Sequence, residues 1–141
     1  VDVLQIEYHL LDWSAEKELL PLAQMHDVGI MVRMPLARGL LTGKFPVGQS
    51  IAPDQQWRRP TGELLQVRLQ RVEQLRFLER VGQTLAQAAI RFVLSHPSVH
   101  CAIPGARTVQ QLEANVAAAD GDLTAEEQAR IKELQQEWSG L

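Results

Sequence analysis

The chain has 141 residues, of which 45% are hydrophobic and 22% are charged, and its formal net charge is -3. This size predicts one globular unit, and the slightly acidic balance excludes a strongly basic surface of the kind that binds nucleic acid. No apolar run has the length of a transmembrane helix and no signal peptide is recognisable, which favours a cytoplasmic protein with no membrane partner. The single cysteine, Cys101, excludes an internal disulfide, and its apolar neighbours predict a buried thiol.

Short apolar runs alternate with amphipathic segments along the chain. Strand patterns cover residues 3–8, 28–32 and 99–103, and helical patterns cover 14–25, 62–80, 85–94, 109–118 and 125–138. Thr84, Thr108 and Thr124 each precede a helical pattern and have Gln or Glu three residues later, which is the arrangement of a capping box. The alternation favours a parallel α/β architecture. Three parallel strands make a poor closed sheet, and the chain starts in a strand pattern at Val1 without a methionine, so we expect a fragment.

A long irregular stretch separates the second strand pattern from the helix expected at residue 62. It runs from about residue 33 to residue 60, and the part over 44–61 is predicted to be one long loop. Loops of this length tend to be functional or mobile. Trp57, Arg58 and Arg59 lie in it, where they could cover a ligand as a lid or form a mobile surface turn, and the surface turn is slightly favoured.

The run from the third strand pattern into the next helix has the features of a phosphate site. The strand ends at Gly105, Arg107 follows, and the helix opens at once, which brings free backbone N–H groups and a positive charge to one spot. Gln111 and Asn115 are four residues apart on one helical face, where their amides could read a flat heterocycle. The same residues also fit a plain turn and a capped helix with an exposed arginine, so the motif alone leaves both interpretations open.

Both stretches with binding potential follow strands. In a (β/α)8 barrel the ligand face is built from the loops after the strands, and the last two loops often bind a phosphate. We therefore interpret residues 1–141 as a single partial domain of the α/β class, the C-terminal part of a TIM barrel with its last three strands and their helices. The chain is far shorter than the roughly 250 residues of a whole barrel. An open sheet with free edges and an exposed apolar face predicts marginal stability for the chain alone.

Other groups of chemically active side chains favour structural roles. His96 and His100 are four residues apart, but Pro97 lies between them, so they do not share a helical face as metal ligands and no metal site is expected. The acidic residues near the last helix are interpreted as a solvated face that favours the helix start. These residues are Asp122, Glu126, Glu127 and Glu133.

Four segments, in order, resemble the aldo-keto reductases. They are Leu4–Leu11, Val32–Lys44, Gly82–Phe92 and Ile103–Asn115, and the likeness spans nearly the whole chain, being weakest between Pro46 and Arg80. The resemblance implies an NADPH-dependent oxidoreductase that, as a full-length protein, reduces small aldehydes or ketones by hydride transfer. It implies that this chain carries the C-terminal, cofactor-binding half of that protein.

The resemblance also implies roles for individual residues. Gln5 matches a strand glutamine that binds the nicotinamide carboxamide, and Arg33 lies where relatives place an aromatic residue or an arginine against the nicotinamide face. The segment that wraps the pyrophosphate is matched by Met34, Pro35, Leu36, Ala37, Arg38, Gly39 and, closing the loop, Lys44. The adenosine end is matched by Gly105, Ala106, Arg107, Gln111 and Asn115, with Arg107 on the 2′-phosphate, so NADP(H) is expected over NAD(H).

Three positions depart from the family pattern. Met34 stands where relatives commonly have a serine, which removes one hydroxyl contact to the phosphates. Ala114 stands where a glutamate commonly binds the adenine amino group, and its loss should weaken binding without abolishing it. Arg38 is often a small residue in relatives, and here it either adds a phosphate contact or faces solvent.

The family's catalytic tetrad has no match in this chain. The resemblance places its tyrosine, lysine, aspartate and histidine in the N-terminal half of the barrel, whereas the one tyrosine here, Tyr8, shares a strand with Gln5. Six lysines and histidines likewise match no tetrad position. They are His9, Lys17, His26, Lys44, His96 and His100. No catalytic residue is therefore predicted, and the alternative function is a non-catalytic NADPH-binding or regulatory module.

Overall fold

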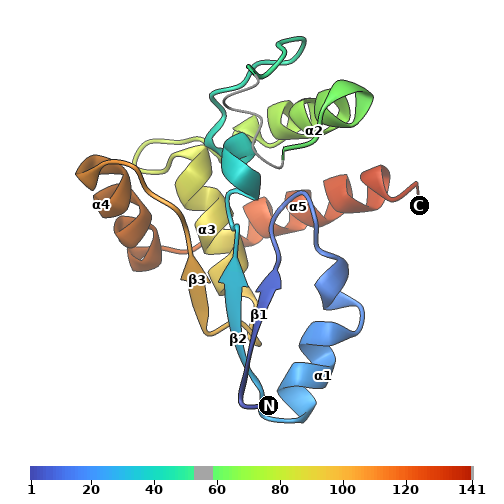
Figure 1. Cartoon of the computed structure of the whole chain (residues 1–141), viewed down its shortest axis with the longest axis vertical. Helices are drawn as coiled ribbons and strands as arrows, with labels where there is room; N and C mark the ends of the chain where they lie inside the picture. Colours follow the sequence, from blue (N-terminus) through green and yellow to red (C-terminus); the bar gives the residue numbers. More distant parts are fainter. Residues whose placement is uncertain (53–58, 141) are drawn as a thin grey trace.

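The computed structural model of the chain describes residues 1–52 and 59–140. Its centre is a parallel sheet with the strand order β1–β2–β3, formed by β1 (Val3–Glu7), β2 (Gly29–Arg33) and β3 (Cys101–Ile103) (Figure 1). The pairing register aligns Gln5, Met31 and Cys101 in one row across the sheet. The next row on the same face joins Glu7, Arg33 and Ile103 at the carboxyl ends of the strands. The predicted parallel α/β sheet is confirmed.

The helices follow the predicted order, with two differences at their ends. They are α1 (Leu19–Met25), α2 (Gly62–Gln74), α3 (Leu85–Ser95), α4 (Val109–Ala117) and α5 (Ala125–Trp138). The helix expected from residue 14 begins as the 3-10 turn η1 (Ser14–Glu16), because Pro21 has no N–H for a helical bond and fits only the first turn of α1. The helix expected over 62–80 ends at Gln74 and continues as the 3-10 turn η4 (Arg76–Leu78).

The expected capping boxes form at two of the three threonines. Thr84 and Thr124 accept a backbone hydrogen bond from the third helical residue, whose own side chain accepts one from the threonine N–H. Thr108 accepts from the Gln111 N–H at 3.1 Å, but the Gln111 side chain accepts from the N–H of Arg107 instead. The third box is therefore only half formed, and its glutamine holds the preceding turn.

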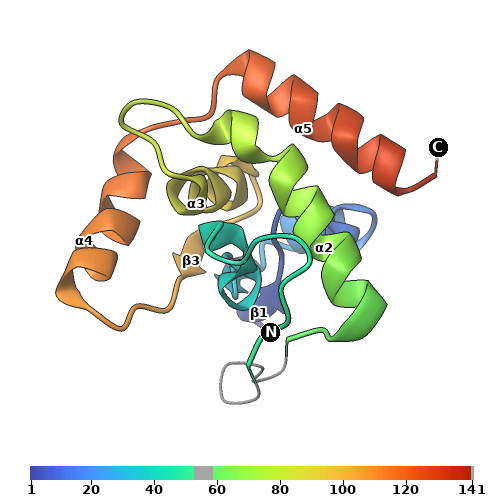
Figure 2. The ribbon, with the colours of Figure 1, turned by 90° about the horizontal axis from the view of Figure 1, so that it is seen from above.

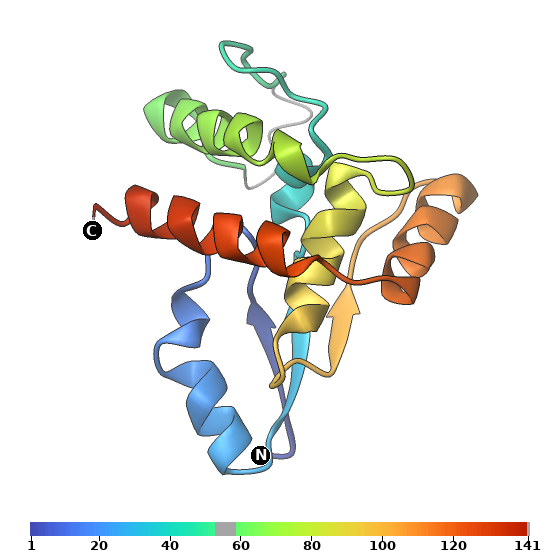
Figure 3. The ribbon, with the colours of Figure 1, turned by 180° about the vertical axis from the view of Figure 1, so that it is seen from behind.

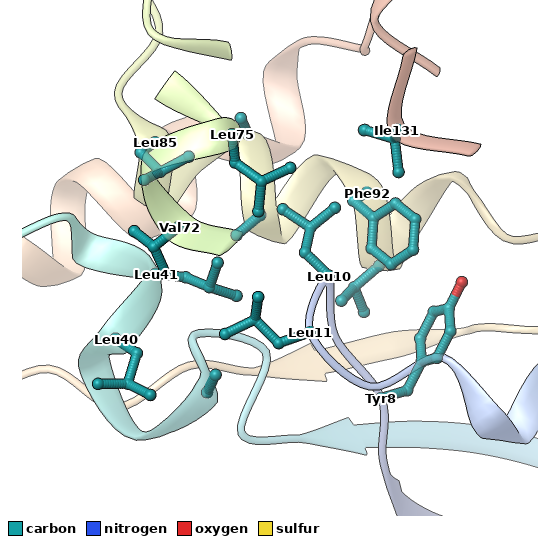
Figure 4. Close-up of a cluster of buried hydrophobic side chains, with 14 of the residues drawn as sticks. Tyr8, Leu10, Leu11, Leu40, Leu41, Val72, Leu75, Leu85, Phe92 and Ile131 are labelled. Carbon is teal, nitrogen blue, oxygen red and sulfur yellow. The ribbon is translucent and has the colours of Figure 1, made fainter. Parts of the chain in front are cut away.

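One face of the sheet carries the core. Ile6, Ile30 and Val32 are buried on this face, which α1, α3 and α5 cover, as the views from the front and from behind make plain (Figures 1 and 3). The core continues above the strand ends, where side chains from the segment after β1, the loop after β2 and helices α2, α3 and α5 pack together (Figure 4). Labelled members of this cluster are Tyr8, Leu10, Leu11, Leu40, Leu41, Val72, Leu75, Leu85, Phe92 and Ile131.

The opposite face of the sheet has no helix over it in the described part of the chain. Val3 is 56% exposed and Ile103 is 44% exposed on this face, and Gln5 is exposed beside them. The prediction of a buried Cys101 thiol is wrong, since Cys101 belongs to the same uncovered row and is exposed. The residue type predicts burial, but burial also requires a covering layer, and none of the described elements supplies it.

Two further regions differ from expectation. No residue of α4 is buried among the described residues, and Val109, Leu112 and Val116 form an exposed apolar stripe along it. Glu127, expected on a solvated acidic face, is buried and accepts from the Arg80 guanidinium at 2.9 Å. Burial raises the pKa of the Glu127 carboxyl, but hydrogen bonds from Arg80, Thr124 and Gln83 outweigh that effect and lower it. The carboxylate is thus a buried partner of the capping box.

Candidate functional site

The carboxyl ends of the three strands open on one side of the molecule, where Figure 2 looks down on them. The loop after β2 and the turn after β3 meet there around a cavity of about 150 Å³. Its lining residues are Met34, Pro35, Leu36, Arg38, Gly39, Ile103 and Gly105. Two segments that the sequence singled out separately therefore contribute to a single hollow.

The loop after β2 has an unusual backbone. Met34, Ala37 and Arg38 are non-glycine residues with φ of 58°, 48° and 58°, and Gly39 follows with φ of 89°. Left-handed residues other than glycine are strained, and such strain persists where the surrounding structure imposes it, often at ligand-binding sites. Hydrogen bonds from the N–H groups of Gly39 and Leu41 to the Leu36 carbonyl hold the turn, which continues into the 3-10 segment η2 (Ala37–Thr42).

Two arginines from this loop face an acid at the end of β1. The Arg33 and Arg38 guanidiniums lie 3.4 Å and 3.5 Å from the same carboxylate oxygen of Glu7. Arg33 is placed by the sheet register directly beside Glu7, while Arg38 reaches it from the left-handed turn. The predicted alternative of Arg38 facing solvent is therefore wrong, because Arg38 pairs with Glu7 at the cavity wall.

Arg59 adds a positive charge beside the loop after β2. The Arg59 side chain donates from Nε to the Arg38 carbonyl at 2.7 Å, and its guanidinium lies 5.3 Å from the centre of the Phe45 ring. Burial lowers the pKa of Arg59, and the positive charge of Arg107 lowers it further. The Lys44 ammonium group also lies over the Phe45 ring, 4.8 Å from its centre.

The lid suggested for the long loop concerns Trp57, Arg58 and Arg59. Trp57 and Arg58 lie outside the described residues, and Arg59 contacts the loop after β2 as given above. The described parts of the predicted loop, 44–52 and 59–61, contain no helix or strand.

The turn after β3 is held by the two amides that were expected to read a base. The Gln111 Oε1 accepts from the Arg107 N–H at 2.8 Å, and Asn115 donates from Nδ2 to the Gly105 carbonyl at 3.4 Å. Ala106 and Arg107 are exposed at the tip of this turn. A Cβ on Gly105 would meet no atom within 4 Å, so internal packing does not require glycine there.

Gln5 lies one row down from the strand ends on the uncovered face. Its Nε2 is 3.9 Å from the Met31 sulfur, and its side chain is exposed. Because side chains alternate along a strand, Gln5 and Glu7 share this face, and the register puts Arg33 beside Glu7. Sequence reasoning missed Glu7, although the same alternation that exposes Gln5 could have identified it.

The single tyrosine lies apart from this site. Tyr8 is buried in the core, and its hydroxyl donates to a Glu16 carboxylate oxygen at 2.5 Å. Burial, together with that carboxylate, raises the pKa of Tyr8 well above its usual value. Tyr8 directly follows β1, but its buried hydroxyl is held by Glu16 and Tyr8 does not line the cavity, so it does not serve as an acid there.

Two of the histidines make structural contacts. His96 packs edge-on against Tyr8, and the His100 Nδ1 accepts from the Ile30 N–H at 3.1 Å. Within residues 1–52 and 59–140, no group of three or more His, Cys, Asp and Glu side chains could hold a metal ion. None of the helices that the structure describes is long and apolar enough to cross a membrane.

Comparison with known protein families and sequences gives a consistent result. Residues 1–136 match the Aldo/keto reductase family. An uncharacterised oxidoreductase of Mycobacterium bovis is 35% identical over 133 residues, which covers 86% of this chain and 38% of the relative. A probable voltage-gated potassium channel subunit beta of Arabidopsis thaliana is 35% identical over 126 residues, covering 84% of this chain and 38% of the relative.

Solved structures show the same likeness. The glycerol dehydrogenase of Gluconobacter oxydans superposes with a TM-score of 0.81 at 27% identity, covering 96% of this chain and 42% of the dehydrogenase. An aldo-keto reductase of Bacillus halodurans in its holo form superposes with a TM-score of 0.71 at 30% identity, covering 95% of this chain and 41% of the reductase. The chain thus spans about two-fifths of the length of the relatives it matches. It belongs to the aldo/keto reductase family and has the fold of the C-terminal part of that family's (β/α)8 barrel.

Proposed function

We propose that this chain is the NADP(H)-binding part of an aldo-keto reductase that reduces small aldehydes or ketones. The observation that carries the proposal is the cavity between the left-handed turn after β2 and the turn after β3, with Arg38 in its lining and Arg107 exposed on the second turn. The bound cofactor would supply the hydride for reduction of the carbonyl group. The family membership supports an oxidoreductase, and the arginines favour a cofactor with an additional phosphate.

The donors around the cavity fit the phosphate groups of such a cofactor. Arg107 and Arg59 would bind the 2′-phosphate, with Gln111 and Asn115 holding the Gly105–Arg107 turn in shape for it. The pyrophosphate would lie along the turn after β2. The residues assigned to it are Met34, Pro35, Leu36, Ala37, Arg38, Gly39 and Lys44.

The uncovered face of the sheet fits the nicotinamide end. The Gln5 side chain has a donor and an acceptor that complement a carboxamide, and it is exposed one row below Arg33. The Arg33 guanidinium is planar and can stack against a flat ring. We assign the cofactor's redox end to these two residues, which puts the carbonyl substrate on the same side of the sheet.

No residue of this chain is assigned the role of proton donor. General acid catalysis needs a donor within hydrogen-bond reach of the substrate oxygen, and Tyr8 is buried with its hydroxyl on Glu16. We therefore assign proton transfer to the other part of the barrel, as the family resemblance implies. A cytoplasmic location completes the proposal.

Cofactor titration tests the proposal. NADPH and NADH are added to the 141-residue chain, and binding is followed by quenching of tryptophan fluorescence. Arg107→Ala should weaken NADPH binding at least about tenfold, because charge-assisted hydrogen bonds to a phosphate contribute roughly 1.5–3 kcal/mol each. NADH binding should not change, since NADH has no 2′-phosphate.

Arg130→Ala is the matched control, because Arg130 is an exposed arginine on α5 that pairs with Glu133. It should bind both cofactors like the wild type. A chain that binds neither cofactor, or an Arg107→Ala variant that keeps its preference for NADPH, would refute the assignment.

The second candidate is a non-catalytic NADPH-binding or regulatory module. It is favoured by the matches to proteins named as channel beta subunits and by the absence of a proton donor among the assigned residues. The two candidate functions differ in whether NADPH is oxidised by a carbonyl substrate. If the protein that contains this chain binds NADPH but does not oxidise it with any of a panel of aldehydes and ketones, the module is supported.

A further inference from the structure

Glu7 lies where β1 ends, between the arginines of the candidate site and a buried histidine. One carboxylate oxygen, Oε2, faces the guanidiniums of Arg33 and Arg38 at 3.4 Å and 3.5 Å. The other oxygen, Oε1, lies 3.3 Å from the Nε2 of His9. The carboxylate therefore has a different kind of partner on each side, and only one of these sides faces the cavity.

His9 is a fixed anchor for this carboxylate. Its side chain is fully buried, and its Nδ1 accepts a hydrogen bond from the Leu11 N–H at 3.2 Å. The ring proton is thereby assigned to Nε2, which donates to Glu7. Two backbone hydrogen bonds between His9 and Asp12, at 3.0 Å and 2.9 Å, hold the histidine in a tight turn. Glu7 is thus held from the protein interior, independently of the arginines.

The charges of this group are unequal. Burial lowers the pKa of His9, and the opposing effect of Glu7 does not restore it, so the histidine is neutral near pH 7. Among the residues that the structure describes, the Glu7 carboxylate then faces two guanidiniums, and its charge offsets part of theirs. Arg38 lines the cavity and Arg33 is half-buried at the strand ends, so these charges lie at the site itself.

We propose that Glu7 is a positioning residue that fixes Arg33 and Arg38 and offsets their charge, so that the site accepts the oxidised, positively charged nicotinamide as well as the reduced ring. This inference rests on the proposed function, which puts the nicotinamide beside Gln5 and Arg33. Its physical basis is that NADP⁺ and NADPH differ by one positive charge on the ring and otherwise offer the same groups. Without Glu7, the two guanidiniums would repel the oxidised ring and leave the reduced ring nearly unaffected.

The test compares three ligands on the wild-type chain and on Glu7→Gln. The ligands are NADPH, NADP⁺ and 2′,5′-ADP, which has the adenosine end but no nicotinamide. Glu7→Gln should weaken NADP⁺ binding about tenfold and NADPH binding about threefold or less, since an uncompensated charge acts mainly on a like charge. Binding of 2′,5′-ADP measures the adenosine and phosphate contacts that both cofactors share, so any change in it applies equally to NADP⁺ and NADPH and leaves their affinity ratio unaltered. A variant that had merely lost local structure would weaken NADP⁺ and NADPH equally.

Arg33→Gln should shift the ratio of NADP⁺ to NADPH affinity in the opposite direction. This test does not depend on whether the Glu7→Gln variant folds. Removal of Arg33 leaves Glu7 facing only Arg38 of the two guanidiniums, so the preference should move toward NADP⁺. Glu79→Gln is the matched control, because Glu79 pairs with Arg76 on the surface at 2.8 Å, and it should leave all three affinities unchanged.

The outcomes separate this inference from the proposed function. If the wild type binds the nucleotides and both variants leave the ratio of NADP⁺ to NADPH affinity unchanged, the inference is wrong and the proposed function stands. If the wild type is folded by circular dichroism and binds none of the three ligands, the proposed function is wrong and the inference is refuted with it.

Discussion

The two faces of the sheet are made by the same strands but serve different ends. On the face covered by α1, α3 and α5, Ile6, Ile30 and Val32 are at most 9% exposed and join the hydrophobic core. On the other face, the same strands present Gln5 and Arg33. Because side chains alternate along a strand, neither set can change its face without changing the register.

This difference separates stability from binding. Burial of apolar side chains drives folding, and here that burial is confined to one side of the sheet. Most residues assigned to the cofactor lie on the other side and at the strand ends, where their replacement leaves the core intact; Ala37, a core member, and Leu36, which packs against the core, are the exceptions. Substitutions on the two faces should therefore have separable effects.

The largest expected effect is on the covered face. Ile30→Ala should lower the free energy of unfolding by about 2–5 kcal/mol, because it leaves a cavity in the central strand's buried face. Ile103→Ala, the same substitution on the 44%-exposed position of the other face, should cost less than about 1 kcal/mol. Urea unfolding of both variants measures the difference. Equal losses would mean that the uncovered face is buried in solution.

The chain alone is expected to be marginally stable, since its sheet has free edges and an uncovered face. In that case Ile30→Ala should be largely unfolded in buffer, which circular dichroism would detect directly. A wild-type chain that unfolds as a native-like monomer only at high temperature would contradict this expectation.

A smaller effect is expected at Tyr8, on the core side of the strand that also carries Gln5. Its folded pKa is raised above the ordinary value of 10.0, so the unfolded state loses this proton first. Above about pH 10 the unfolded state binds fewer protons than the folded state, and stability should fall as the pH rises. Below pH 10 this contribution is fully present.

The chain has one tyrosine, so its phenolate absorbance reports Tyr8 alone. The native chain should develop that absorbance only when it unfolds. Tyr8→Phe should remove the alkaline component and cost about 1.5 kcal/mol at neutral pH, because the hydrogen bond to Glu16 is lost. A phenolate signal that appears at pH 10 in the folded chain would contradict a buried hydroxyl.

Local patterns predicted the elements of the fold well. The short apolar runs located all three strands to within two residues at each end. Thr84 and Thr124 form the predicted capping boxes. These features depend on neighbours in sequence, which is why the sequence reveals them. The family segments likewise identified the barrel, since their order along the chain is itself specific.

Features that depend on contacts between distant segments were missed. The contact of Arg59 with the Arg38 carbonyl, and that of Arg38 with Glu7, arise only when the segments meet at the strand ends. The capping box expected at Thr108 is incomplete for a local reason, because the Arg107 N–H, four residues away, competes for the Gln111 side chain. Residue types and spacing reveal neither the distant contacts nor which local donor is bound.

The smallest effect is expected from chemical modification of Cys101, which tests whether the uncovered face is accessible without altering stability. The thiol is exposed, so a disulfide reagent such as Ellman's should react with the native chain at a rate near that of a free thiol. The sequence alone predicts the opposite, a buried and protected thiol. Addition of denaturant should change the rate little, because the thiol is already exposed in the folded state.

A thiol that reacts only after unfolding would show that the second face of the sheet is covered in solution, by another copy of the chain or by another protein. The same result would predict that Ile103→Ala destabilises the chain as much as Ile30→Ala does.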